Sequence, residues 1–222
     1  MRFVLHEQSY EKPIASGKLV YEQDGQPTGV VESWRLTDAA AGYRFLRVDL
    51  DGRAAASGNS SLFHLTLNPQ GQPERLLFRF FGPIEQIKGS VLFDGNVLTI
   101  VRELTGQARQ EEQLEATHFW FPSTVGLGLL AGLVGEGQVE AGMLAAAASF
   151  TPRLVSLRYH EDQPEMVEVM GKQWQTRPLT LTWADQTRTI WLDAHHQPLL
   201  MKRQDGLRGR ETRYIRYQDL LP

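Results

Sequence analysis

The sequence predicts an all-β chain built on one strongly curved antiparallel sheet that forms a half-barrel, with one helical insertion near residues 123–135. Two observations predict this class. Short runs rich in β-branched, aromatic and leucine residues alternate with turn signals at regular spacing, which is typical of an antiparallel meander. One long segment, residues 117–150, lacks the polar–apolar alternation of half-buried strands. We therefore expect a sheet that a helical element interrupts once, near the middle of the chain.

Asp-Gly pairs provide most of the turn signals. Both residues tolerate the positive φ angles of tight hairpin turns, so an Asp-Gly pair between two β-rich runs predicts a hairpin. The clearest case lies within residues 18–36, where Asp24 and Gly25 separate two such runs. The pair recurs at three further places, Asp51-Gly52, Asp94-Gly95 and Asp205-Gly206.

The expected strands follow from these turns. The chain starts with an apolar run, residues 1–10, which predicts a first strand, whereas the Gln- and Glu-rich residues 105–113 predict a loop. The run 76–81 is largely apolar on both faces, so we expect core on one side of it and a helix or a ligand on the other. Further strands are expected at 30–36, 43–50, 61–67, 87–93, 96–104, 154–159, 166–170, 179–183, 187–193, 199–203 and 209–217.

The segment of residues 117–150 combines an aromatic start with an almost uncharged apolar body. Ser123 or Thr124 can cap a helix that runs to about Gly135. Each glycine inside this helix weakens it by up to about 1 kcal/mol relative to alanine, so tertiary packing must hold the helix in place. The alanine-rich residues 143–149 fit either a helix or the start of the next strand. We expect this helical element either to cover the sheet permanently and fill its concave side, or to gate the concave face as a lid.

The composition bounds the class of protein. Of the 222 residues, 41% are hydrophobic and no linker is visible, so we expect one domain over residues 1–222. The net charge of −3 lacks the basic excess that is typical of nucleic-acid binders. The chain has no cysteine, which excludes disulfides and cysteine-based zinc or redox sites. No secretory signal and no apolar stretch long enough to span a bilayer are visible, which favours a soluble, cytoplasmic protein and leaves its oligomeric state open.

Two fragments have the composition of known sites without their context. His195 and His196 are adjacent, so on a strand end they point to opposite faces and cannot chelate one ion, and we predict no metal. Gly126-x-Gly128 opens the expected helix but lacks the βαβ context of a dinucleotide site, so we predict no cofactor. The arginines of residues 203–216 alternate with acidic residues, which favours a solvated sheet edge over RNA binding.

The second half of the chain carries an ordered pattern. Phe121-Pro122 precedes the apolar helix, a strand ends in Val169-Met170-Gly171, and strands 179–183 and 189–193 lead to a return at Pro198-Leu199. In this order the chain resembles uncharacterised bacterial β-rich half-barrel proteins, which are themselves similar to outer-membrane lipoprotein carriers and glycolipid-binding proteins. The resemblance implies an incomplete barrel whose concave face holds an apolar ligand under a helical lid. It implies no catalytic residues.

These observations predict non-enzymatic binding of an apolar or amphipathic small molecule, such as a lipid or glycolipid, on the concave face of the sheet. The side chains expected to line the site are Trp34, Phe63, Phe78, Phe80, Phe93, Trp120, Leu130, Trp183 and Trp191. The same side chains fit a filled core equally well, and the chain would then be a structural or protein-interaction scaffold. A further alternative is a hydrolase or isomerase in a β-cup. Its candidates are Glu32 and His64, because each lies among apolar neighbours on its strand.

Overall fold

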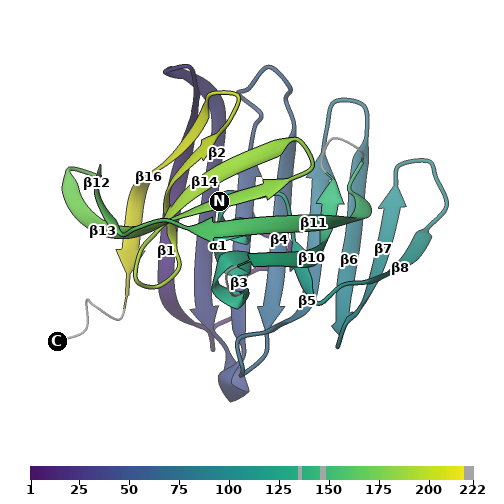
Figure 1. Ribbon diagram of the computed structural model, residues 1–222. Coiled ribbons are helices and arrows are strands. Elements are labelled where there is room, and N and C mark those ends of the chain that lie inside the picture. The colour runs from purple at the N-terminus through teal and green to yellow at the C-terminus, as the bar shows by residue number, and fades with distance from the viewer. Residues whose placement is uncertain (135–136, 146–148, 218–222) are drawn as a thin grey trace. The chain divides into compact units, whose positions relative to one another are not determined.

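The computed structural model describes residues 1–134, 137–145 and 149–217 (Figure 1). Strands dominate it, and the described residues contain one α-helix and one short 3₁₀ helix. The elements in chain order are β1 (Lys12–Gln23), β2 (Gln26–Asp38), η1 (Ala40–Gly42), β3 (Arg44–Asp51), β4 (Ser60–Leu67), β5 (Pro73–Phe81), β6 (Gln86–Asp94), β7 (Val97–Leu104), β8 (Gln110–Glu115), β9 (His118–Trp120), α1 (Thr124–Leu133), β10 (Gly137–Ala145), β11 (Thr151–Glu161), β12 (Glu165–Val169), β13 (Lys172–Trp183), β14 (Gln186–Leu192), β15 (Pro198–Arg203) and β16 (Leu207–Arg216).

The strands follow one another in a single hydrogen-bonded order. That order is β8-β7-β6-β5-β4-β3-β2-β1-β16-β15-β14-β13-β11-β10-β9, and β12 adds to β13. Among the described residues the two end strands, β8 and β9, are not hydrogen-bonded to each other, so the sheet is open. The pairs with a described register are antiparallel except β9 and β10, which run parallel. The predicted fold class, mainly antiparallel β-structure on one unclosed sheet with a helical insertion, is therefore confirmed.

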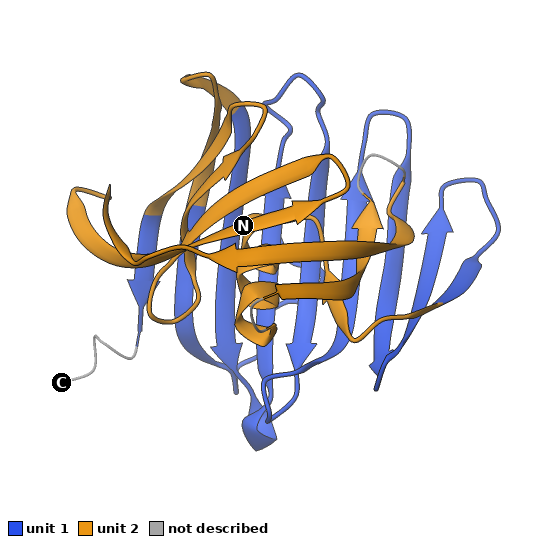
Figure 2. Cartoon of the chain, in the orientation of Figure 1, with its two compact units in different colours: residues 1–18, 29–113, 213–222 blue, residues 19–28, 114–212 orange. Residues whose placement is uncertain are grey.

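The chain forms two compact units (Figure 2). Unit 1 comprises Met1–Lys18, Gly29–Gln113 and Arg213–Pro222, and unit 2 comprises Leu19–Thr28 and Leu114–Thr212. Strands β1, β2 and β16 contribute residues to both units. The expectation of a single domain stays a prediction.

The core of unit 1 is ordered by cross-strand rows. Trp34, Val48, Phe63 and Phe78 lie opposite one another on β2 to β5, and each is at most 1% exposed. Burying one such side chain contributes about 1.5–3 kcal/mol. The row continues on β6 at Gly89, where a Cβ atom would lie only 2.3 Å from Cζ of Phe78. The glycine thus makes room for the aromatic ring, because alternation brings both residues to one face.

Residues 1–10 do not form the strand expected from their apolar composition. They lie against the opposite, polar face of β3, where Arg2 pairs with Asp49 at 2.9 Å and the Leu5 carbonyl accepts a hydrogen bond from Arg47. The backbone of this segment is thus held by charged side chains of the sheet, which take the place of a neighbouring strand.

The loop expected at residues 105–113 is also shorter than predicted. Its second half belongs to β8, which pairs with β7 as an end strand of the sheet. The buried Arg102 donates hydrogen bonds to Gln110 at 2.8 Å and to Glu112 at 2.5 Å. The polar composition that suggested a loop is therefore that of a charged edge strand, a common protection against edge-to-edge pairing.

The helical insertion lies in unit 2. The Ser123 hydroxyl caps α1 by accepting the backbone N–H of Gly126 at 2.7 Å, as the sequence predicted. Gly128 of α1 allows close packing on the turn between β14 and β15. A Cβ atom on Gly128 would lie 2.9 Å from Cδ of Pro198 and 3.0 Å from the His196 carbonyl oxygen. Gly128 thus weakens the helix locally but lets it approach this turn.

The alanine-rich residues at 143–149 are described only in part. Residues 143–145 end β10, so for them the strand interpretation is correct and the helix interpretation is wrong. Residues 146–148, and the predicted helix end at 135, lie outside the described residues. In the described residues, α1 and the 3₁₀ helix are both too short to cross a membrane.

Candidate functional site

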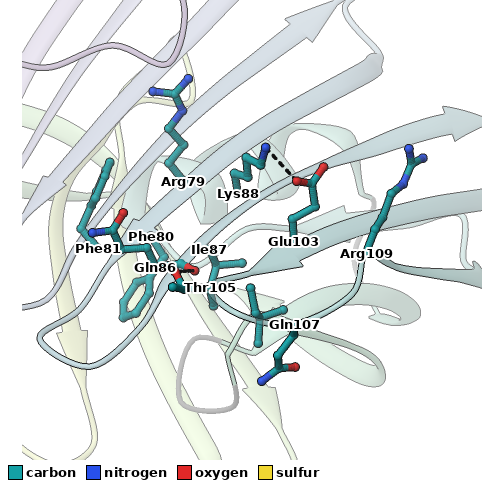
Figure 3. A pocket seen from close by; sticks show the side chains of 11 residues that line it. Arg79, Phe80, Phe81, Gln86, Ile87, Lys88, Glu103, Thr105, Gln107 and Arg109 are labelled. Atoms are coloured by element: carbon teal, nitrogen blue, oxygen red, sulfur yellow. Dashed lines mark hydrogen bonds and ion pairs between the residues drawn. The ribbon is translucent and has the colours of Figure 1, made fainter.

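A pocket of about 360 Å³ lies in unit 1 where β5 and β7 end and β6 begins (Figure 3). The β5–β6 turn and the residues that follow β7 border it. The turn is closed by a hydrogen bond from the Gly82 N–H to the Glu85 carbonyl at 2.9 Å. The lining residues are Arg79, Phe80, Phe81, Gln86, Ile87, Lys88, Glu103, Leu104, Thr105, Gln107 and Arg109.

The strand register explains why apolar and charged side chains both reach this pocket. Phe80 and Ile87 lie opposite each other on β5 and β6, and Leu104 continues this apolar row on β7. The neighbouring row, on the other face, consists of Arg79, Lys88 and Glu103. Successive side chains of a strand point to opposite faces, so an interior strand position would show only one of these rows. At the strand ends, the pocket borders both.

The pocket carries an excess of positive charge. Three cations, Arg79, Lys88 and Arg109, line it together with one carboxylate, Glu103, which leaves a net charge of +2 (three minus one). Lys88 pairs with Glu103 at 2.7 Å, and Arg109 pairs with the neighbouring Glu111 at 3.3 Å. Arg79 is exposed, and within the described parts of the chain it forms no ion pair. The electrostatics therefore favour an anionic group over a cationic one.

Most of the aromatic and aliphatic residues predicted to contact a ligand are buried. Phe80 is the one that lines the pocket of unit 1, and Trp191 lines a second groove in unit 2. Phe93 and Trp191 are half-buried. The remaining side chains are Trp34, Phe63, Phe78, Trp120, Leu130 and Trp183, all in the core. Ligand contact by these residues stays a prediction.

The structure brings two of these predicted residues together in unit 2. Trp120 and Trp183 meet edge to face, with ring centroids 5.0 Å apart. The guanidinium of Arg188 lies 5.1 Å from the Trp120 ring and 5.3 Å from the Trp183 ring. Such cation–π contacts favour a positive charge over the face of an indole. The sequence does not signal Arg188, because the pairing of β13 with β14 brings it near Trp183, and the Trp183 ring in turn meets that of Trp120 on β9.

The two candidates for an enzyme are both buried, but they do not converge. Glu32 shares the core face with Trp34, since the two alternate along β2. His64 lies opposite Arg47, on the polar face of β4. Burial, assisted by the Arg47 charge, lowers the pKa of His64 to about 4, so its imidazole is neutral near pH 7. A sheet separates the two groups, and they cannot act on one substrate atom as an acid–base pair.

The paired histidines form a structured turn. Asp193 accepts hydrogen bonds from the backbone N–H of His195 at 2.8 Å and of Gln197 at 2.9 Å. Burial and the Arg177 charge lower the pKa of His196, whose Nδ1 lies 3.0 Å from an Arg177 nitrogen. The two imidazoles therefore belong to a polar hairpin turn. Over residues 1–134, 137–145 and 149–217, the structure brings no three His, Cys, Asp or Glu side chains close enough to hold a metal ion.

The cationic residues of the pocket were missed in the sequence. Arg79 and Lys88 belong to alternating strands, which by themselves indicate only a solvated face. The register of β5 on β6 places Arg79 and Lys88 directly opposite each other. Arg109 also lines the pocket, because it lies in the connection between β7 and β8. No signal in the sequence specifies these cross-strand relationships.

Comparisons with known proteins identify the fold. No protein-family model matches this chain, and no curated protein matches it. The chain is similar to a crystal structure described as a beta-barrel-like protein of domain of unknown function DUF1849 from Brucella abortus. The two share 15% sequence identity with a TM-score of 0.60, over 93% of this chain and 98% of that chain. At this identity the likeness shows a common β-barrel-like fold with a bacterial protein, in agreement with the resemblance to bacterial β-rich proteins at that level.

Proposed function

We propose that the chain binds an amphipathic anion, a molecule with an apolar chain and an acidic headgroup such as a fatty acid or an acidic glycolipid, without chemical turnover. The pocket of unit 1 carries this proposal, because its lining combines the apolar row of Phe80, Ile87 and Leu104 with a net positive charge. The resemblance to glycolipid-binding proteins and lipoprotein carriers suggests the same class of ligand.

The size of the pocket supports a small ligand or one end of a larger one. Its volume of about 360 Å³ lies at the low end of the roughly 300–1,000 Å³ range of small-molecule sites. Each methylene group removed from water contributes about 0.8 kcal/mol, so even a short chain adds useful affinity. Ile84, in the turn between Phe81 and Gln86, is 96% exposed. The apolar chain of a ligand that leaves the pocket along this turn would cover the exposed side chain of Ile84.

The cations support an acidic headgroup. Arg79 presents its guanidinium without an ion pair in the described residues. Guanidinium groups bind carboxylates and phosphates through two parallel hydrogen bonds, which are stronger than hydrogen bonds between neutral groups. An anion at Arg79 would also draw Lys88 partly away from Glu103, with which it now pairs.

A titration with a fluorescent fatty acid, together with native mass spectrometry of the gently purified protein, tests the proposal. We expect saturable binding, and a loss of affinity of about tenfold or more for Arg79→Gln, because one charged hydrogen-bonding partner is removed. Arg75→Gln is the matched control, since Arg75 is exposed on the same strand but does not line the pocket. This control should bind like the wild type.

Two results would overturn the proposal. Either no saturable binding is found, or Arg79→Gln and Arg75→Gln weaken binding equally. In the first case the chain would be left with a filled core and a structural or scaffolding role.

A further inference from the structure

A second groove, of about 230 Å³, lies within unit 2 on the strands β1, β14, β15 and β16. Apolar and charged side chains both line it. Trp191, Leu200 and Val20 form part of the apolar lining, Lys202, Arg208 and Arg210 supply three positive charges, and Glu22 supplies one negative charge. The groove shares no residue with the pocket of unit 1.

Two cross-strand rows build this groove. In the first row Trp191 lies opposite Leu200, which in turn lies opposite Arg210. In the second row, one step along the same face, Lys202 lies opposite Arg208. The groove therefore combines an indole, an aliphatic side chain and two facing cations on neighbouring positions of one face.

The facing cations are the unusual feature. Side chains directly opposite in an antiparallel pair have Cβ atoms about 4.5–5.5 Å apart, and like charges placed so are destabilising. Lys202 and Arg208 are both exposed, and neither forms an ion pair in the part of the chain that the structure describes. An anionic group between them would replace this repulsion by two charge-assisted hydrogen bonds. Arg210 differs from Lys202 and Arg208 because it has an ionic partner: a guanidinium nitrogen of Arg210 lies 3.8 Å from a carboxylate oxygen of Glu22.

The indole of Trp191 is held in place beside these cations. Its N–H donates a hydrogen bond to the carboxylate of Glu165 on β12. The polar edge of the ring is thereby satisfied. Indoles bury large apolar areas and pack well on flat rings. An aromatic ligand is accordingly favoured over a flexible chain in a groove of this small volume.

We propose that this groove is a ligand site for a small aromatic anion. The acidic group lies between Lys202 and Arg208, and the ring packs on Trp191 and Leu200. This inference goes beyond the proposed function, because it concerns another unit, other residues and a ligand of different shape. Neither proposal depends on the other.

NMR spectroscopy of the isotope-labelled protein gives a local test. The indole N–H resonance of Trp191 is assigned by its disappearance in Trp191→Phe, and naphthalene sulfonate is then titrated as the probe. We expect a saturable shift of this resonance, while the indole resonance of Trp34, in the core of unit 1, stays in place. A neutral probe, naphthalene methanol, should bind at least about tenfold more weakly, because it lacks the charged group.

Charge variants decide whether the cations cause the binding. Lys202→Gln and Arg208→Gln should each weaken naphthalene sulfonate binding by about tenfold or more. Arg158→Gln, which removes an exposed cation from β11 of the same unit outside the groove, should leave it unchanged. Far-UV circular dichroism confirms that each variant is folded. The proposal is overturned if the Trp191 resonance does not move at millimolar probe, or if all three variants bind equally.

Discussion

Arg47 and Glu11 form a two-pronged ion pair in the interior of unit 1. Both terminal nitrogens of the guanidinium lie 2.7 Å from carboxylate oxygens of Glu11, and the two side chains are 1% and 0% exposed. Thr37 donates a further hydrogen bond to the same carboxylate at 2.5 Å. Burial alone would raise the pKa of Glu11, but the hydrogen bonds from Arg47 and Thr37 outweigh it, so the pKa is lowered. The ion pair thus links Glu11, directly before β1, to Arg47 on β3.

Arg47→Met should strongly destabilise the protein. It leaves the Glu11 carboxylate buried without its cation, and breaking one partner of a buried pair costs about 3–5 kcal/mol. Urea unfolding measures this loss. The double variant Arg47→Met/Glu11→Leu should recover part of it, because no charge then remains buried.

Arg44→Gln serves as the control for this measurement. Arg44 lies on the same strand, and both it and its ionic partner Asp38 are exposed. Its replacement should change stability by less than about 1 kcal/mol. A loss in Arg47→Met no greater than in Arg44→Gln would contradict the prediction.

The stability of the protein should fall as the pH drops from about 6.5 to about 4, and His64 should cause part of this fall. Its folded-state pKa of about 4 lies below the ordinary value of 6.5, because burial disfavours the imidazolium. Between these values the unfolded chain binds the proton and the folded chain does not, so acid favours unfolding. The difference of about 2.5 pKa units corresponds to at most roughly 3.5 kcal/mol, at about 1.4 kcal/mol per pKa unit. The lowered pKa of Glu11 acts at lower pH, since its stabilisation is lost only below about 4.5.

Urea unfolding of His64→Gln between pH 4 and 7 tests this prediction. The free energy of unfolding should depend less on pH in this variant than in the wild type. His160→Gln, which removes an exposed histidine, should keep the wild-type slope. Equal slopes in all three proteins would show that His64 does not titrate as expected.

Gly128→Ala and Gly132→Ala, two alanine substitutions in α1, should have opposite effects on stability. Alanine favours a helix over glycine by about 1 kcal/mol. At Gly128, however, the added Cβ would meet Pro198 and the backbone of His196 at about 3 Å. Such overpacking costs about 1–3 kcal/mol, so after the helix gain we expect a net loss of up to about 2 kcal/mol. At Gly132 the nearest atom, in the His196 ring, is 3.4 Å away, and the variant should be neutral or slightly stabilised.

Thermal unfolding followed by circular dichroism distinguishes the two variants of α1. A lower melting temperature for Gly128→Ala alone is the expected result. If both variants are stabilised, α1 does not pack closely on the turn before β15, and the helix would be free to move as a lid.

Glu103→Gln should strengthen binding of an amphipathic anion in the pocket of unit 1. The change removes the only carboxylate among the pocket's lining residues and releases Lys88 from its ion pair. We expect affinity for a fluorescent fatty acid to rise by about twofold to tenfold at low salt, and the gain to shrink as salt screens the charges. Glu74→Gln makes the same change in net charge on β5, away from the pocket. If affinity rises equally in Glu103→Gln and Glu74→Gln, the net charge of the protein causes the effect, and the prediction for Glu103 is wrong.

Local chemistry determined the turns, the helix start and the class of the fold. Asp24 and Gly25 take positive φ angles between β1 and β2, as an Asp-Gly pair predicts. Ser123 caps α1 for an equally local reason, since its hydroxyl reaches a backbone N–H three residues ahead. These features involve residues that are close in the chain, so their energies can be read from composition and spacing.

The tertiary structure decided which distant residues meet. The apolar composition of residues 1–10 predicts a strand, but Arg47 and Asp49 bind this segment to one face of the sheet. No property of the segment itself indicates these contacts. Only strand register places Arg79 opposite Lys88, and Lys202 opposite Arg208. A shift of one residue would move each of these side chains to the other face. The candidate sites therefore depend on pairings that the packing of the whole sheet selects, whereas a strand's own pattern specifies only which residues alternate.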